Sequence, residues 1–203
     1  MKYLMFDTET TNDIECPICY DFGFSVIDED GKVYEQGSYV VADIFLDKSL
    51  METAYFKDKI PQYWEDIKSG KRILRRFKTI KSILRDVVAQ YGIRYVVAHN
   101  ASFDYRSLNY TQRLLTSSKY RYFLPWGVEI WDTLKMAREC LGKDKQYRQF
   151  CLDNADLFRT LVNARHLLFA DMANFEHFLR PAAVFHVIQQ HTRCIGCVAR
   201  MHA

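Results

Sequence analysis

The stretch that most constrains the fold is Tyr3-Leu4-Met5-Phe6-Asp7-Thr8-Glu9-Thr10, a short apolar run that ends in two acidic residues. An apolar run of this length is typical of a buried strand. Because side chains alternate along a strand, Asp7 and Glu9 are expected on one side of the sheet. Two converging carboxylates repel unless a cation lies between them, and hard divalent cations prefer oxygen ligands. The stretch therefore predicts a strand that ends in a metal site; the alternative is an acidic strand end that faces solvent.

The sequence on either side of this strand alternates between strand and helix patterns. Further strands are predicted at Phe22–Ile27, Lys32–Val41, Tyr95–Ala98 and Val128–Trp131, the first two joined by the turn Asp28–Gly31. Helices are predicted at Arg72–Tyr91, ended by Gly92, at Phe103–Leu115, and from a cap at Asp132 to Leu141. A hairpin followed by alternating helices and strands indicates an α/β fold, a mixed sheet flanked by helices.

A second polar motif, His99-Asn100-Ala101-Ser102-Phe103-Asp104, follows the predicted strand Tyr95–Ala98. It places Asp104 in the first turn of a helix. The helix dipole favours a carboxylate there without any catalytic role, so a purely local role for Asp104 is the alternative.

Two motifs together resemble those of the DEDD superfamily of 3′–5′ exonucleases: Phe6-Asp7-Thr8-Glu9-Thr10 and His99-Asn100-x-x-Phe103-Asp104. The resemblance is to the DEDDh type of this superfamily, and in particular to its small phage-encoded members. The resemblance covers residues 1 to about 150. It implies a ribonuclease-H-like fold and two Mg²⁺ or Mn²⁺ ions, with Asp7 bridging both, Glu9 on one and Asp104 on the other. Two such ions serve phosphodiester hydrolysis by activating a water and stabilising the leaving oxygen.

The resemblance also implies contacts to the 3′-terminal nucleotide from Thr8 and Thr10, which flank Glu9. Asn100 and Phe103 are expected to line the same cleft, Phe103 by stacking on a base. The alternative for Phe103 is a core residue.

The third motif of the family is a histidine base followed after four residues by a carboxylate, and His166 and Asp171 match this spacing. They lie in a part of the chain that differs in composition from about residue 150 onward, where tyrosine is absent and five of the six histidines are found. The alternatives are a helical C-terminal part with its own composition, or a substituted tail in which both residues lie on a helix surface. One continuous domain, residues 1–203, is expected in either case.

The leading hypothesis is a metal-dependent 3′–5′ exonuclease that acts on single-stranded DNA 3′ ends and releases nucleoside 5′-monophosphates. The alternatives are the same chemistry on short RNA, or a catalytically impaired module that binds nucleic-acid ends. Neither the net charge of +3 nor the 49% hydrophobic content discriminates among them, but no apolar run is long enough for a membrane span. Without a signal-peptide pattern, the expected location is the cytoplasm, or the host cytoplasm if a phage encodes the protein.

Two further features have open interpretations. Seven basic residues lie between Lys71 and Arg85, either as a solvated helix face or as a track for a phosphate backbone. Cys16 with Cys19 and Cys194 with Cys197 form two CxxC pairs, which are either reduced thiols or, if the chain ends meet, a zinc site.

Overall fold

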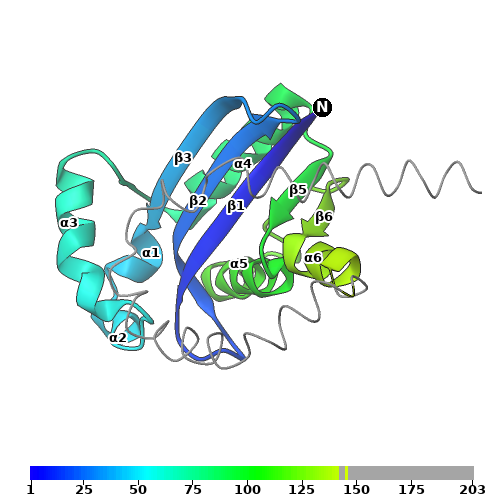
Figure 1. The fold of residues 1–203 in the computed structure, drawn as a ribbon. Coiled ribbons are helices and arrows are strands. Elements are labelled where there is room, and N and C mark those ends of the chain that lie inside the picture. Colours follow the sequence, from blue (N-terminus) through cyan, green and yellow to red (C-terminus); the bar gives the residue numbers. More distant parts are fainter. Residues whose placement is uncertain (142–144, 146–203) are drawn as a thin grey trace, which may run out of the picture. The chain divides into compact units, whose positions relative to one another are not determined.

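The computed structural model describes residues 1–141 and residue 145 (Figure 1). Met1–Asp132 form one compact unit, and a second begins at Thr133. The expectation of one continuous domain stays a prediction. In the part of the chain that is described, no helix has the length and apolar character needed to cross a membrane.

A six-stranded mixed sheet organises the first unit, in the order β4-β3-β2-β1-β5-β6 (Figure 1). Its strands are β1 Lys2–Thr11, β2 Ile18–Asp28, β3 Val33–Val41, β4 Ile73–Arg75, β5 Tyr95–Ala98 and β6 Glu129–Asp132. Within this sheet β2 alone runs against its neighbours, and the other pairings are parallel. The expected α/β class with a mixed sheet is confirmed, and the order β3-β2-β1-β5-β6 is that of the ribonuclease-H-like fold.

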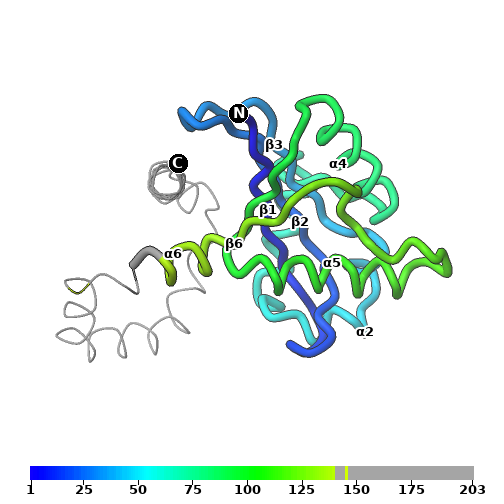
Figure 2. Tube along the Cα trace, turned by 90° about the vertical axis from the view of Figure 1, so that its right-hand side faces the viewer, coloured from blue at the N-terminus to red at the C-terminus, as the bar shows by residue number. Residues whose placement is uncertain are grey.

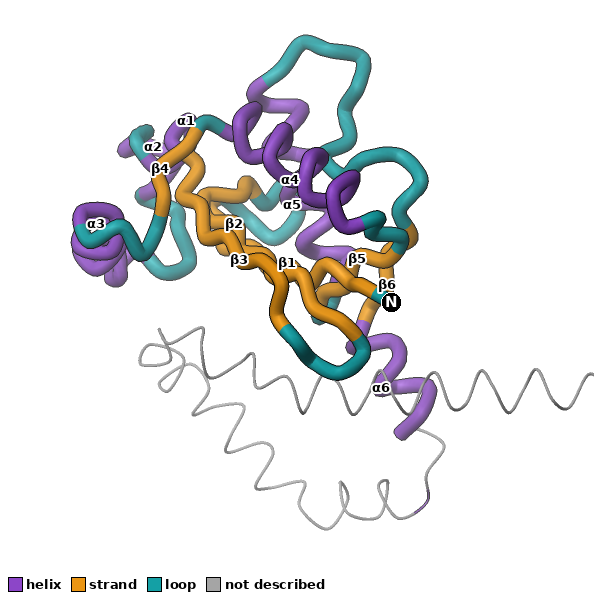
Figure 3. The backbone as a smooth tube through the Cα atoms, turned by 90° about the horizontal axis from the view of Figure 1, so that it is seen from above, coloured by secondary structure: helices purple, strands orange, loops and turns teal. Residues whose placement is uncertain are grey.

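The two long helices, α4 Phe77–Tyr91 and α5 Ala101–Leu115, lie on the same side of the sheet (Figure 3). Alternate residues of the strands, such as Leu4 and Phe6 of β1, form a buried core with Leu84 and Leu108 of these helices. Burial of an aliphatic or aromatic side chain contributes about 1.5–3 kcal/mol, so this layer is the main source of stability of the unit.

The segment 116–128 leads from the end of α5 back to β6 (Figure 2). Phe123 anchors it, with its ring 5.4 Å from that of Phe22 and 4.8 Å from that of Phe77 between centroids. Its backbone N–H also donates to Asn109 Oδ1 at 2.9 Å. The last described helix, α6 Thr133–Leu141, follows β6 directly and begins the second unit.

The predicted start of helix α4 at Arg72 is wrong. Residues 73–75 pair in parallel with Tyr39–Val41 as β4, and the helix begins at Phe77, whose N–H donates to Asp43 Oδ2 at 2.7 Å. The four-residue step from Ile73 to Phe77 imitates helical spacing, but Ile73 lies half-exposed on an edge strand. The predicted end is confirmed, since Gly92 has the left-handed φ of 61° that favours glycine after a helix.

Between β3 and β4 the chain makes an excursion that the periodicity did not predict. It contains the short helices α1 Ala42–Phe45 and α2 Lys48–Met51, the 3₁₀ turn η1 Lys57–Lys59 and the helix α3 Ile60–Lys68. Asp47 caps α2 by accepting from the N–H groups of Ser49 and Leu50, and Pro61 lies in the first turn of α3, where its missing N–H costs nothing. We call residues 42–72 the β3–β4 excursion.

Candidate active site

The candidate site is built on the C-terminal half of β1. Pairing with β2 is regular from Lys2 to Glu9, and a bulge follows between Glu9 and Thr10. Asp7 and Glu9 therefore lie on one face of the sheet, as expected, while Thr8 points to the face covered by α5. On its other side β1 pairs with β5 from Tyr3 to Met5, and among the described strands none continues along this edge of β1 beside the two carboxylates.

Asp104 is hydrogen-bonded to Thr8, the residue of β1 that lies between Asp7 and Glu9. Its Oδ1 accepts a hydrogen bond from the Thr8 hydroxyl at 2.7 Å and another from the Thr8 N–H at 3.1 Å. The Thr8 hydroxyl also lies 3.1 Å from Ser107 Oγ, and Asp104 itself is buried. The structure thus brings Asp7, Glu9 and Asp104 to one end of the sheet, and the hydrogen bonds from Thr8 hold Asp104 there. Thr8 was expected to contact substrate, and here its hydroxyl positions a carboxylate.

Replacing Thr8 by valine should weaken this attachment of Asp104. Valine has nearly the same shape but lacks the hydroxyl, so a buried carboxylate loses one of its donors. We expect a loss of about 1.5–3 kcal/mol in the free energy of unfolding, the range for a hydrogen bond to a charged group. Urea denaturation measures it, with Thr79→Val on the exposed face of α4 as the control. An equal cost for both variants would contradict the role assigned to Thr8.

The pKa values of the three carboxyl groups are all raised, mainly by burial and then by neighbouring negative charge. Partial burial, opposed by a hydrogen bond from the Thr8 backbone and supported by the charge of Asp21, raises the pKa of Asp7 to about 6, although its side chain still reaches solvent. Burial and then the charges of Asp7 and Asp21 raise the pKa of Glu9 to about 8. Burial and then the charge of Asp7 raise the pKa of Asp104 to about 7. Negative charge accumulates here without enough compensation from the protein.

These residues fit divalent cations in their chemistry. Carboxylate oxygens are the ligands that Mg²⁺ and Mn²⁺ prefer, and bound cations would relieve the mutual repulsion. Among the residues that the structure describes, however, no three His, Cys, Asp or Glu side chains converge on one point that could hold a metal ion. Each ion would therefore need further oxygen ligands, from water, from a substrate phosphate or from beyond residue 141.

The raised pKa values predict how stability depends on pH without metal. The ordinary values are 3.8 for Asp and 4.5 for Glu, so between about pH 4 and 8 the folded chain binds more protons than the unfolded chain. The free energy of unfolding should then fall as the pH rises through this window. In chelator, we expect a higher melting temperature at pH 5 than at pH 8, and recovery at pH 8 on adding Mn²⁺. Glu9→Gln should make the melting temperature in chelator less dependent on pH. An unchanged dependence on pH would argue against a raised pKa at Glu9.

A fourth carboxylate lies next to the site, and sequence reasoning missed it. Asp21 of β2 is the cross-strand partner of Glu9 and is buried. Its Oδ2 accepts from the Arg72 guanidinium and, at 2.8 Å, from the Tyr63 hydroxyl, while Arg72 Nε donates to Asp66 Oδ2 at 3.2 Å. Asp21 Oδ1 has no hydrogen-bond partner among the described atoms. The one signal in the sequence was an acidic residue in the apolar run Ile18–Ile27.

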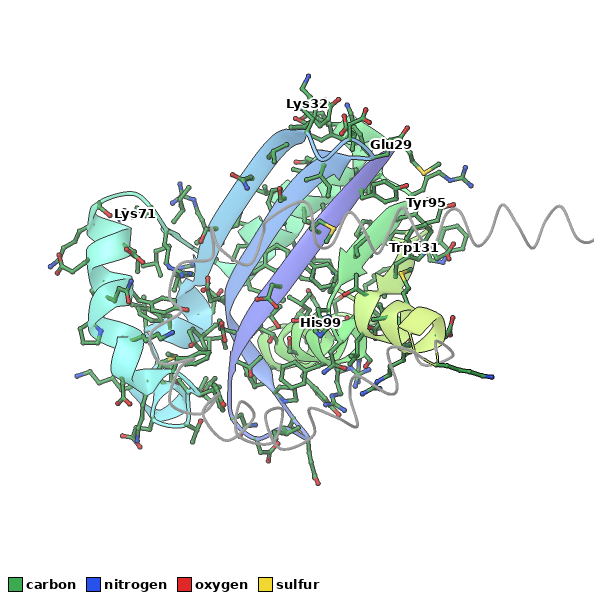
Figure 4. The ribbon with its side chains drawn as sticks, in the orientation of Figure 1. Glu29, Lys32, Lys71, Tyr95, His99 and Trp131 are labelled. Atoms are coloured by element: carbon green, nitrogen blue, oxygen red, sulfur yellow. The ribbon has the colours of Figure 1, made fainter. Side chains whose placement is uncertain are left out.

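The other predicted contact residues occupy the loop and helix that follow β5. Asn100 has a left-handed φ of 61°, and its N–H donates to Asp132 Oδ1 at 3.0 Å. Asp132 directly precedes α6, where a cap was expected, and also holds this loop. Figure 4 shows His99 immediately after β5, at the start of α5. Phe103 is half-buried, with the Arg106 guanidinium carbon 5.9 Å from its ring centroid, so it is not the fully buried core residue of the alternative.

Several predictions lie partly or wholly outside the described residues. The predicted base His166 and the predicted ligand Asp171 lie outside the described residues, and so does the second CxxC pair, Cys194 with Cys197. Of the first CxxC pair, Cys16 is exposed, whereas burial raises the pKa of the Cys19 thiol well above its usual range and disfavours the thiolate that zinc needs.

The basic run between Lys71 and Arg85 is not one surface. Arg72 belongs to the buried ion-pair network with Asp21, and Arg85 is paired with Asp86 at 3.1 Å. The interpretation as a single helix face is therefore wrong.

Comparison with known proteins concerns the fold alone. No family model matches the chain, and no curated protein matches its sequence. Solved structures that resemble it include Exonuclease I from Methylocaldum szegediense, with a TM-score of 0.46 and 16% identity over 71% of this chain and 30% of that chain. E. coli Exonuclease I in complex with a 5cy-dA13 oligonucleotide gives a TM-score of 0.40 and 14% identity over 71% and 31%. The chain thus spans under a third of the length of these exonucleases, and at such low scores the likeness says nothing of activity.

Proposed function

We propose that the chain is a metal-dependent exonuclease that hydrolyses phosphodiester bonds at the 3′ ends of single-stranded DNA and releases nucleoside 5′-monophosphates. The observation that carries the proposal is the attachment of Asp104 to Thr8, between Asp7 and Glu9. Two motifs separated by about 95 residues thereby supply three carboxylates to one end of the sheet. The proposed location is the cytoplasm, or the host cytoplasm if a phage encodes the protein.

In the proposed reaction, a water oxygen attacks the terminal phosphorus and the bond from phosphorus to the 3′ oxygen of the preceding nucleotide breaks. The preceding nucleotide keeps the 3′ oxygen as a hydroxyl, and the terminal one leaves as its 5′-monophosphate. Two divalent ions, when bound, supply an activated water and charge stabilisation for the leaving oxygen. We assign Asp7 and Glu9 to one ion and Asp7 and Asp104 to the other.

Each side chain contributes to this task through its position. Both hydrogen bonds from Thr8 go to Asp104 Oδ1, so the second oxygen of Asp104 is the one we assign to a metal ion. Asp7 lies at the exposed middle of the set, where it can serve both ions, and Glu9 lies beside Asp21. A general base is still required, and His166, with Asp171 as a fourth ligand, is our proposal for it. Thr10, Asn100 and Phe103 are proposed to contact the terminal nucleotide.

A binding module is the second candidate. The observation that favours it is that, within the described part of the chain, no three metal-ligating side chains surround one point. Such a protein would hold nucleic-acid ends without cleaving them.

One incubation separates the two candidates. The purified chain is mixed with a 5′-labelled single-stranded DNA oligonucleotide and Mn²⁺, with and without chelator. A ladder that shortens from the 3′ end and disappears with chelator supports the exonuclease. An intact oligonucleotide, bound by a chain that circular dichroism shows to be folded, supports the binding module. A matched RNA oligonucleotide tests the preference for DNA.

A further inference from the structure

The β3–β4 excursion is fastened to the end of β1 directly after Glu9. The Tyr55 N–H donates to the Thr10 carbonyl oxygen at 3.3 Å. The Thr53 hydroxyl lies 2.8 Å from that of Thr11 and accepts from the Asn12 N–H at 3.0 Å. Residues 53–55 are therefore held at a fixed place beside the strand that carries Asp7 and Glu9.

The same segment presents an aromatic ring to solvent. Tyr55 is 67% exposed, although its backbone is tied to Thr10. Its ring packs edge-to-face on that of Phe56, with the centroids 4.7 Å apart and an interplanar angle of 83°. The contact with Phe56 restrains the ring, and the exposure of Tyr55 leaves much of its surface open to a ligand. An exposed aromatic of this kind is the platform on which bases of a single strand stack.

A lysine completes the segment. Lys59 Nζ lies 4.4 Å from the Phe56 ring centroid, at the end of η1. Lys59 is also close enough to Glu9 for its charge to oppose the rise in the pKa of that carboxyl. An ammonium group near an accumulation of carboxylates favours the approach of an anionic phosphate, which the carboxylates alone would repel.

We propose that Tyr55, Phe56 and Lys59 form a subsite for the terminal nucleotide of a single-stranded nucleic acid. The base stacks on the Tyr55 ring, which Phe56 supports, and Lys59 faces the phosphate. The subsite rests on the proposed function, since that function places the scissile bond at Asp7, Glu9 and Asp104. It is carried by three contacts: Tyr55 to Thr10, Tyr55 to Phe56 and Lys59 to Phe56.

Stacking is measured with a single-stranded DNA oligonucleotide that carries 2-aminopurine as its 3′-terminal base, in chelator so that it stays intact. Binding to the wild-type chain should quench the terminal fluorescence. Tyr55→Ala should weaken binding about 5- to 150-fold, the range for loss of one base stack, and abolish the quench. Tyr55→Phe should keep both. Tyr120→Ala is the matched control, because Tyr120 is 82% exposed on the segment 116–128.

The role of Lys59 is tested through salt. Lys59→Met should lower the slope of log affinity against log salt concentration by about 0.7, the value for one phosphate contact on a single strand. Lys48→Met, on the exposed surface of α2, should leave the slope unchanged. An unaltered slope for Lys59→Met would remove Lys59 from the proposal.

The outcomes also separate this proposal from the proposed function. A Tyr55→Ala chain with wild-type affinity and quench overturns the subsite, even if the wild-type chain cleaves DNA in Mn²⁺. A loss of quench in Tyr55→Ala upholds the subsite, even if no chain cleaves. Absence of any terminal quench with the wild-type chain also overturns it.

Discussion

Replacing Asp7 by asparagine should lower chelator-sensitive cleavage of single-stranded DNA by at least about 10³-fold. Asn keeps the shape of Asp7 but removes the negative charge from the one side chain proposed to serve both metal ions. Charge stabilisation of the transition state by bound metal amounts to several kcal/mol, and each 1.36 kcal/mol corresponds to a factor of ten in rate. Single-turnover cleavage of a 5′-labelled oligonucleotide in Mn²⁺ measures the loss.

Asp30→Asn is the matched control for this substitution, because Asp30 lies exposed in the turn between β2 and β3. It should cleave at the wild-type rate. Asp7→Asn should itself fold, and in chelator at pH 8 it should be at least as stable as the wild-type chain, because it removes one of the repelling charges. Cleavage by Asp7→Asn at the wild-type rate would refute the assignment of the site.

Replacing Arg72 by methionine should destabilise the chain by about 3–5 kcal/mol. Its guanidinium neutralises Asp21, which lies buried beside Glu9, and removal of one partner of a buried ion pair leaves an uncompensated charge. The same side chain lies over the Tyr63 ring, 4.3 Å from its centroid, and links α3 to the sheet. At about 2–4 °C per kcal/mol, the melting temperature should fall by roughly 6–20 °C.

Two further variants identify the cause of that loss. Arg85→Met removes an arginine whose ion pair with Asp86 is exposed, and it should cost at most about 1 kcal/mol. Asp21→Asn in the Arg72→Met background removes the orphaned charge and should recover part of the stability. If Arg72→Met and Arg85→Met cost the same, or if the double variant is no better than Arg72→Met, the buried pair is not the source of stability inferred here.

The central strand and its carboxylates could be predicted from the sequence because the pattern is local. An apolar run fixes the strand, and the two-residue period then fixes that Asp7 and Glu9 share a face. That Asp104 joins them was expected from the resemblance of the two motifs to those of a known superfamily, and the structure supplies the physical reason, because Asp104 follows a strand that pairs in parallel with β1. Parallel neighbours end at the same edge of a sheet, and this brings the second motif to the first.

What the sequence did not reveal depends on long-range contacts or on short elements. Arg72 was assigned to a basic helix face because its neighbours are basic, whereas its partner Asp21 lies 51 positions away. The excursion between β3 and β4 is built from helices of four residues and one of nine, too short for the periodicity to identify. The proximity of Tyr55 to Thr10 and of Lys59 to Glu9 could not be predicted either, because these residues are far apart in the sequence. The assignment of His166 and Asp171 stays a prediction.

The two hydrogen bonds from Thr8 to Asp104 make one backbone amide a reporter for the site. The Thr8 N–H donates to a side-chain carboxylate, that of Asp104. Its ¹⁵N and ¹H resonances should therefore follow the protonation of Asp104, and should move again when a cation draws electron density from that carboxylate. A single labelled threonine position would thus let nuclear magnetic resonance titrate the occupancy of the site in solution, without substrate and without turnover.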